Sequence, residues 1–432
     1  MEKMQRNKGI TLISLVVTII ILIILAGITI NIILGKNGVI EKTKEAKIGT
    51  DIGREKEIIQ LAVGDIATGN EGKLNFNKAS LEKALKDNSN IENVKVEKDS
   101  GQSYKVTYLD SGRQYKVLSD GRVREKTEAT SVYVTMDGDV AILSNNPIND
   151  TSTDIKENEY RKSWGSKVKI INQISPTYTG YWFCNATEIE GLENLDVSNV
   201  TNMEGMFSYC KLNNIDILDW DVSNVTDMHS MFEGSDLTAV DVSAWDVSNV
   251  TDMRYMFSSC FKLTTVGNLD NWNVSNVTNM YSMFLGCDFT TVGNLDNWNV
   301  SNVTDMTNLF YNCHKLTIVG KLDNWNVSNV TTMYGMFYEC NKLTTVGNLD
   351  KWDVSKVTSL YKMFKYDKEL VTIGDISNWN VSNVTDMTDM FGYCSSLKTV
   401  GNLNKWDVSK VQYMRDMFYQ TTLSPVPSWY ME

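Results

Sequence analysis

Trp272-Asn273-Val274-Ser275-Asn276-Val277-Thr278-Asn279-Met280-Tyr281-Ser282-Met283-Phe284-Leu285-Gly286-Cys287 is one copy of a phrase that recurs from Asp196 to Phe418. Its Val-Ser anchor falls at nine positions spaced by 25 to 27 residues: Val197, Val222, Val247, Val274, Val300, Val327, Val354, Val381 and Val408. Self-similarity with a period of roughly 20 to 50 residues is typical of proteins built from stacked repeats. We therefore expect residues 195–432 to form a solenoid of nine repeats that ends in a C-terminal cap.

Two patterns predict the structure inside each repeat. Leu237, Val240, Val242 and Trp245 are spaced like the strand of a leucine-rich repeat, with Trp at the corner. The apolar residues of the quoted phrase, from Val277 through Met280 to Cys287, follow a helical period. Each repeat is thus expected to be a strand, a Trp corner and a short helical turn, and the stacked strands are expected to form a parallel β-sheet.

The longer repeats carry an added residue that coincides with a glycine in the predicted strand. These glycines are Gly267, Gly293, Gly320, Gly347, Gly374 and Gly401. An extra residue with glycine inside a strand favours a β-bulge. We expect a bulge repeated down the sheet.

Six of the seven cysteines occupy one slot, three residues after the repeat Phe. Ser235, Asp367 and Thr421 fill the same slot in other repeats. Free Cys packs as a small hydrophobic residue. Burial is therefore favoured over disulfide or metal chemistry, and no metal or cofactor is expected.

The acidic charge is concentrated in the repeats. From Leu195 onward there are 27 Asp and Glu against 15 Lys and Arg, a net charge of −12, which is the net charge of the whole chain. Such a surface repels phosphate, so we do not expect a nucleic-acid partner. A column of Asp270, Asp296, Asp323 and Asp350 is a possible calcium site. Solvated turns are favoured because the glycine-rich pattern of calcium-binding repeats is absent.

The chain begins with a short basic leader, residues 1–9, followed by 25 uncharged residues from Ile10 to Leu34. At ~1.5 Å per residue this run reaches ~37 Å as a helix, enough to cross a hydrocarbon core of ~30 Å. We expect residues 10–35 to form a transmembrane helix that crosses the membrane through residues 10–34. The basic leader favours a cytoplasmic N-terminus and an extracellular remainder.

The segment Lys8-Gly9-Ile10-Thr11-Leu12-Ile13-Ser14-Leu15-Val16-Val17 resembles the N-terminus of type IV prepilins and pseudopilins. The resemblance implies that a prepilin peptidase cuts after Gly9 and that Ile10 becomes the first, methylated residue. The family usually has Glu where this chain has Ser14, so a carboxylate that helps subunits assemble is missing. A signal-anchor helix that is never cut is the alternative.

Residues 36–125 are expected to hold a helix extension and a small α+β domain. A second helix is predicted over Asn77–Lys86, with strands at residues 93–96, 104–108 and 114–117. Residues 126–162 are expected to form a hairpin and a linker. Residues 163–194, with the apolar run Tyr181-Trp182-Phe183, are interpreted as the N-terminal cap of the solenoid.

The repeated phrase, over residues from about 180 to 420, is similar to that of the BspA-like leucine-rich-repeat surface proteins. That resemblance implies a place at the bacterial cell surface and adhesion to host or bacterial proteins or glycans. The expected fold class is therefore α+β with a solenoid: a pilin-like transmembrane helix, a small α+β domain and leucine-rich repeats.

Two hypotheses of function follow. In the first, the protein is an adhesion module on the cell surface, and its repeats bind a protein or glycan through exposed strand positions. The candidate positions are Thr265, Asn268, Asp270, Thr291, Asn294, Asp296, Thr345, Asn348 and Asp350. In the second, it is a minor pilin or pseudopilin, a structural subunit of a pilus or secretion machine. The repeated frame and the remaining chain offer no catalytic constellation, with His229 and His314 the only histidines, so we do not expect an enzyme.

Overall fold

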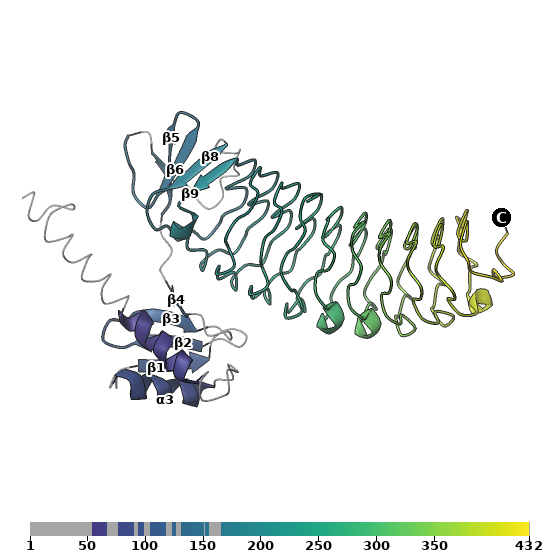
Figure 1. Ribbon diagram of the computed structural model, residues 1–432, viewed down its shortest axis with the longest axis horizontal. Coiled ribbons are helices and arrows are strands. Elements are labelled where there is room, and N and C mark those ends of the chain that lie inside the picture. Colours follow the sequence, from purple (N-terminus) through teal and green to yellow (C-terminus); the bar gives the residue numbers. More distant parts are fainter. Residues whose placement is uncertain are drawn as a thin grey trace, which may run out of the picture. The chain divides into compact units, whose positions relative to one another are not determined.

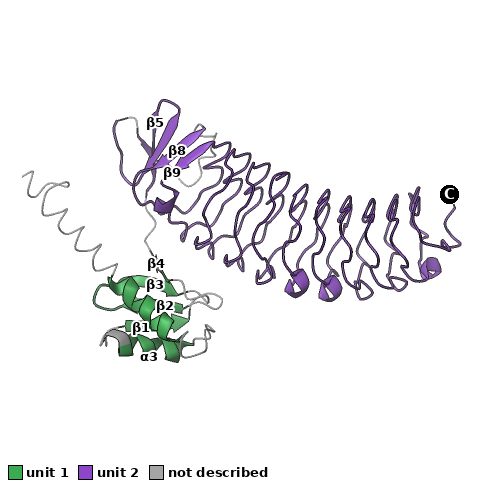
Figure 2. Ribbon diagram, in the orientation of Figure 1, with its two compact units in different colours: residues 1–126 green, residues 127–432 purple. Residues whose placement is uncertain are grey.

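The computed structural model describes residues 54–66, 77–89, 94–98, 104–117, 123–126, 131–150, 152–154 and 166–431. The chain divides into two compact units, residues 1–126 and residues 127–432 (Figure 2). The predicted leader and transmembrane segment, including Gly9, Ile10 and Ser14, lie outside the described residues. Among the described helices, none combines the length and the apolar character that crossing a bilayer requires.

The first unit packs two helices against a four-stranded antiparallel sheet (Figure 1). The helices are residues 54–66 and α3 (Lys78–Ser89), and the strands are β1 (Val94–Lys98), β2 (Tyr104–Tyr108), β3 (Gln114–Val117) and β4 (Val123–Lys126). Asn77 caps α3 as its sequence predicts, because its Oδ1 accepts from the Ser80 N–H at 3.0 Å. The predicted helix and all three predicted strands of this region are confirmed within a few residues.

The core of this unit explains why these segments fold together. Ile59 and Leu81 from the helices and Val106 and Tyr115 from the sheet are fully buried in one cluster. The Tyr115 hydroxyl donates to Glu55 at 2.7 Å, so the helix 54–66 is held to the sheet by polar as well as apolar contacts.

The second unit begins with a five-stranded sheet in the order β7-β5-β6-β8-β9. Its strands are β5 (Tyr133–Asp137), β6 (Val140–Ser144), β7 (Thr153–Asp154), β8 (Lys167–Ile170) and β9 (Glu188–Glu190). β5 and β6 form the predicted hairpin, while β6, β8 and β9 run parallel. Trp182 and Phe183 follow β8 and are buried in the same core as the repeats.

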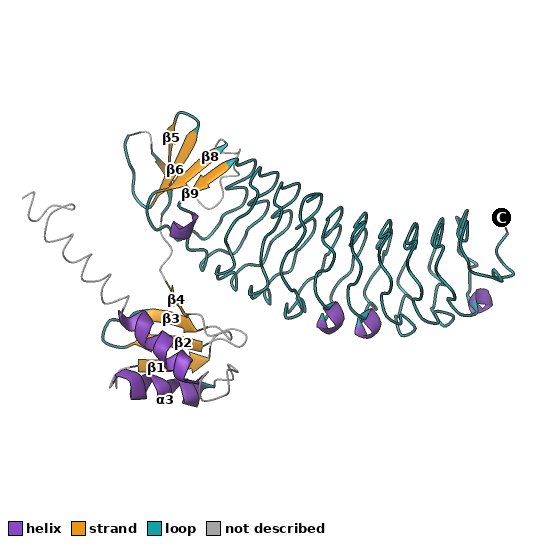
Figure 3. Cartoon of the chain, in the orientation of Figure 1, coloured by secondary structure: helices purple, strands orange, loops and turns teal. Residues whose placement is uncertain are grey.

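The repeats from residue 195 onward are stacked coils built almost entirely of turns (Figures 1 and 3). Short 3-10 helices interrupt the turns at η1 (Leu192–Asn194), η2 (Leu295–Asn297), η3 (Leu322–Asn324) and η4 (Leu403–Lys405). Aromatic columns run through the core. The repeat phenylalanines stack from Phe183 to Phe418 with ring centroids 5.2 to 5.9 Å apart.

Backbone hydrogen bonds in the Met280–Cys287 segment alternate between two directions. The N–H groups of Met280, Ser282 and Phe284 donate to the next repeat, at 2.9 to 3.1 Å. The N–H groups of Met283 and Cys287 instead donate to the residue three positions earlier in the same repeat. One set of bonds closes each turn and the other joins it to its neighbour, so nearly every backbone donor in the segment is satisfied.

The fold-class prediction is wrong. It required leucine-rich repeats with a helical turn and a parallel sheet, together with a transmembrane helix. Over residues 195–431, the described chain contains no α-helix, and its inter-repeat pairing consists of isolated parallel bridges, such as Asn279 with Asp305. The helix-like spacing of Met280, Met283 and Cys287 is produced by successive turns. Ser282, with φ 53°, has a left-handed backbone conformation that a right-handed helix cannot include.

The predicted glycine bulges are also wrong, because the described residues 195–431 form isolated bridges and no sheet that a bulge could interrupt. Gly267, Gly293, Gly320, Gly347, Gly374 and Gly401 all have φ between 81° and 95°. These are left-handed turn positions, where only glycine fits without strain. The burial of all six cysteines of the repeat slot confirms the packing interpretation of that slot.

Candidate binding surfaces of the repeat stack

The nine residues predicted as a binding face lie at the turns beside these glycines. Thr291 Oγ1 accepts from the Gly293 N–H at 3.1 Å, and Asn294 Oδ1 accepts from the Asp296 N–H at 3.2 Å. Thr265, Asn268, Thr345 and Asn348 make the same bonds in their own repeats. These side chains are exposed or half-buried. Their oxygens already accept hydrogen bonds from the backbone and stabilise the turns.

The acidic column connects one repeat to the next. Asp323 Oδ1 accepts from the Asn348 N–H at 2.6 Å, and Asp270 and Asp296 accept in the same way from Asn294 and Lys321. A carboxylate that satisfies a backbone N–H of its neighbour stabilises the stack. The expectation of simply solvated turns is therefore corrected for these three aspartates.

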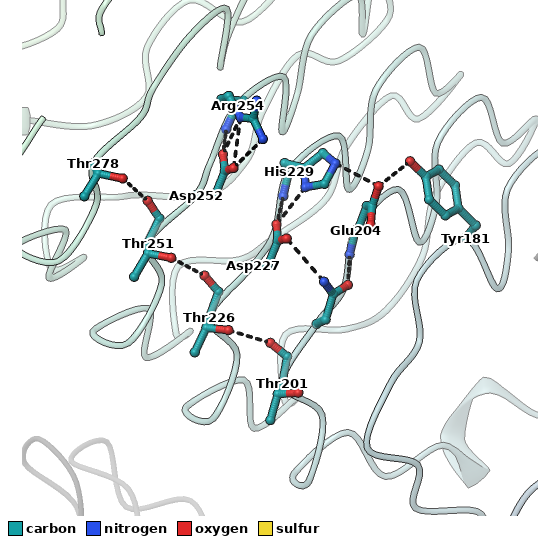
Figure 4. A network of polar contacts seen from close by, with 11 residues as sticks. Tyr181, Thr201, Glu204, Thr226, Asp227, His229, Thr251, Asp252, Arg254 and Thr278 are labelled. Carbon is teal, nitrogen blue, oxygen red and sulfur yellow. Dashed lines mark hydrogen bonds and ion pairs between the residues drawn. The ribbon is translucent and has the colours of Figure 1, made fainter. Parts of the chain in front are cut away.

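A charged network joins the cap to the first three repeats (Figure 4). Both ring nitrogens of His229 contact carboxylates: Nδ1 lies 2.8 Å from Asp227 and Nε2 lies 2.9 Å from Glu204. The Tyr181 hydroxyl donates to Glu204 at 2.7 Å. The hydrogen bond to Asp227 raises the pKa of His229, although burial opposes it. The network therefore favours a charged imidazole held between two repeats.

The same cluster is where the described residues come closest to a metal site. Asp227, His229 and Asp252 each offer a ligand atom within 4.8 Å of the others. In this arrangement both nitrogens of His229 are occupied by carboxylates, and Arg254 Nη2 lies 2.7 Å from Asp252. The cluster is thus a hydrogen-bonded network as it stands. Glu204, His229 and Arg254 occupy equivalent positions 25 residues apart in successive repeats. This spacing could have predicted the cluster, but the histidines were considered only as single residues in the sequence.

The later repeats carry an aromatic surface that sequence analysis did not predict. We define the tyrosine strip as Tyr311, Tyr338, Tyr366, Tyr393 and Tyr419, each one or two residues after the repeat Phe. Neighbouring ring centroids along it are 4.4, 5.9, 4.5 and 5.3 Å apart. Every ring of the strip is exposed or half-buried. The strip therefore runs continuously over five repeats.

A second tyrosine pair and two lysines lie against the strip. Tyr334 and Tyr361 stack at 4.7 Å. Lys362 Nζ lies over the Tyr361 ring at 4.7 Å and over Tyr338 at 5.4 Å. Lys365 Nζ lies 5.1 Å from the Tyr366 centroid and pairs with Asp389 at 2.9 Å. Cation–π contacts of this kind contribute about 0.5–1 kcal/mol each at exposed sites and fix the rings in place.

A comparison with known families matches the repeat region. Residues 177–292, 261–347, 288–372 and 343–431 match the family described as "Mycoplasma protein of unknown function, DUF285". No curated protein and no solved structure matches the chain.

Proposed function

The chain belongs to the DUF285 family, and we propose that its repeats are a binding module that uses the tyrosine strip as the contact surface for a partner protein. The observation that carries this proposal is the unbroken row of half-buried and exposed rings from Tyr311 to Tyr419. Tyrosine is enriched at protein interfaces because one ring offers apolar area and a hydroxyl at a low cost in side-chain entropy.

The strip is also preorganised. Stacking between repeats and the lysines above the rings restrict the tyrosine rotamers before any partner binds. Binding then costs less conformational entropy than it would for isolated surface tyrosines. Tyr419 is 45% exposed and the other four rings of the strip are half-buried, which leaves ring edges and hydroxyls accessible to a partner.

The ring geometry favours a protein over a glycan as the partner. Sugars pack their C–H groups on an open aromatic face. At centroid separations of 4.4 and 4.5 Å, the Tyr311–Tyr338 and Tyr366–Tyr393 pairs cover one face of each ring with the other ring. The edges and hydroxyls that remain suit peptide groups and side chains.

We place this module at the cell surface, where the apolar run of residues 10–34 and the prepilin-like leader support export and anchoring. The pilin-subunit alternative depends on the same leader, on cleavage between Gly9 and Ile10, and on the effect of Ser14 on assembly.

The proposal is tested with cells that express the full chain and with a panel of immobilised extracellular-matrix proteins. Replacing Tyr366 and Tyr393 by Ser removes two central rings, and we expect adherence to fall by about tenfold or more, since each interface anchor contributes at least about 1 kcal/mol. The matched control replaces Tyr255 and Tyr281, an edge-on pair outside the strip, and should adhere like the wild type. Equal adherence of all three chains would reject the tyrosine strip as the contact surface.

A further inference from the structure

A pocket of about 600 Å³ opens where the cap meets the first repeat. Ile189 of β9 and Leu192 of η1 line it from the cap, and Leu195, Ile215 and Trp220 line it from the first repeat. Small-ligand sites typically enclose roughly 300–1,000 Å³. The pocket is large enough for one long side chain and part of its backbone.

The pocket exists because the tryptophan column ends here. Leu195 stands at the position that holds Trp in every later repeat, just before the Asp/Asn-Val-Ser sequence. Eight tryptophans from Trp245 to Trp429 donate their indole N–H to a carbonyl of the preceding repeat, at 2.8 to 3.1 Å. Leu195 is smaller than an indole and leaves the space beside Trp220 unfilled.

The pocket is lined by apolar side chains whose equivalents in the later repeats are buried. Leu212, Ile215 and Trp220 are only partly buried, whereas their counterparts in the next repeat, such as Leu237 and Trp245, are at most 3% exposed. Within the described part of the chain, the Trp220 indole N–H also has no hydrogen-bond partner. An indole donor at the wall of an apolar pocket favours a ligand that brings an acceptor.

The rim of the pocket is acidic. Glu193 and Asp216 are exposed and line it, and none of the lining residues that the structure describes is Lys or Arg. Two exposed carboxylates at the mouth of an apolar pocket attract a positively charged group. The methylene groups of Lys or Arg can pack on the apolar wall, and the cationic group can pair with the carboxylates of the rim. A carbonyl of the bound peptide can accept a hydrogen bond from the Trp220 indole N–H.

We propose that this pocket binds a lysine or arginine side chain of an extended peptide segment in a partner protein. The site is separate from the tyrosine strip, and its proof or failure leaves the strip proposal unaffected. The pocket would select basic segments, whereas the tyrosine strip supplies contact area without charge preference.

The test is a fluorescence-anisotropy titration of the full chain with a labelled peptide of alternating Ala and Lys, and with an Ala-Glu peptide of equal length. We expect the Lys peptide to bind and the Glu peptide not to bind. Leu195→Trp introduces the side chain that the other repeats carry, fills the pocket and should weaken Lys-peptide binding by about tenfold or more. Glu193→Gln with Asp216→Asn should also weaken it, without changing any buried residue.

Asp139→Asn with Asp350→Asn is the matched control, because it removes the same charge from exposed positions outside the pocket. It should leave affinity within about twofold, which separates the pocket from general attraction to an acidic surface. The proposal is overturned if the Lys peptide does not bind, if the control loses as much affinity as the rim variant, or if a folded Leu195→Trp protein binds normally.

Discussion

At the scale of single residues, the turn glycines show how closely the repeats approach one another. Gly320 has φ 88°, and a Cβ built there would lie 2.0 Å from Asn294 Oδ1 of the preceding repeat. The side-chain oxygens that shape the predicted binding face therefore also fill the space that a larger residue would need. Glycine is required at this position because the backbone has a positive φ and because a side chain would clash with the preceding repeat.

We expect Gly320→Ala to destabilise the second unit by about 1–3 kcal/mol, because alanine is strained at positive φ and must displace Asn294. Denaturant unfolding followed by tryptophan fluorescence measures this directly, since every tryptophan of the chain lies between Trp164 and Trp429, in the second unit.

Gly138→Ala is the matched control in the same unit. Gly138 also has a positive φ, 61°, but a Cβ there would meet nothing within 4 Å, so alanine should destabilise the unit by less than Gly320→Ala does. A Gly320→Ala protein as stable as the wild type would show that the contact between repeats adapts without cost.

At the scale of the elements, the sequence predicted the period and the core of the repeats but not their local geometry. Steps of three and four residues between apolar positions fit a helix and also fit successive turns. A helix is excluded because every repeat contains a position with a left-handed backbone conformation, that is, with positive φ. Ser282, Asn308 and Lys362 occupy this position although they are not glycine. Since non-glycine residues seldom adopt this conformation, no residue type identifies it in advance.

The cysteine slot offers a test of packing within one repeat. Asp367 fills this slot, is fully buried and has an Oδ2 atom without a hydrogen-bond partner, and burial holds the pKa of its carboxyl well above its usual range. Asp367→Cys installs the residue of six other repeats. We expect it to raise the free energy of unfolding at pH 7 by about 1–3 kcal/mol, measured by denaturant unfolding.

The pH dependence of that gain follows from the raised pKa. The unfolded carboxyl ionises above about pH 4 while the folded one stays protonated, so the wild type loses stability as the pH rises through and above that value. The advantage of Asp367→Cys should be smaller at pH 4 than at pH 7. Ser235→Cys is the control, because Ser235 already contacts Cys260 Sγ at 3.4 Å. A pH-independent gain would contradict a buried neutral carboxyl.

At the scale of the whole molecule, the candidate site was the least predictable part. The nine residues predicted as a binding face flank apolar positions of the expected strand, and the structure uses most of their side chains in turns or in bonds between repeats. The tyrosines of the strip vary in position relative to the repeat Phe, as at Tyr338 and Tyr366, so they form no obvious pattern in the sequence. Stacking of the coils brings them into one line. The prediction of cleavage before Ile10 concerns residues outside the described part and stays a prediction.

Photo-cross-linking from Tyr338 tests the central claim most directly. A photoreactive phenylalanine analogue replaces Tyr338 in the full chain on adherent cells, and Asn299, an exposed residue outside the strip, is replaced in the control. We predict a covalent adduct with one partner protein from position 338, lost when Tyr366 and Tyr393 are changed to Ser, and no adduct from position 299. Equal adducts from both positions, or an adduct from position 299 alone, would contradict a binding surface at the tyrosine strip.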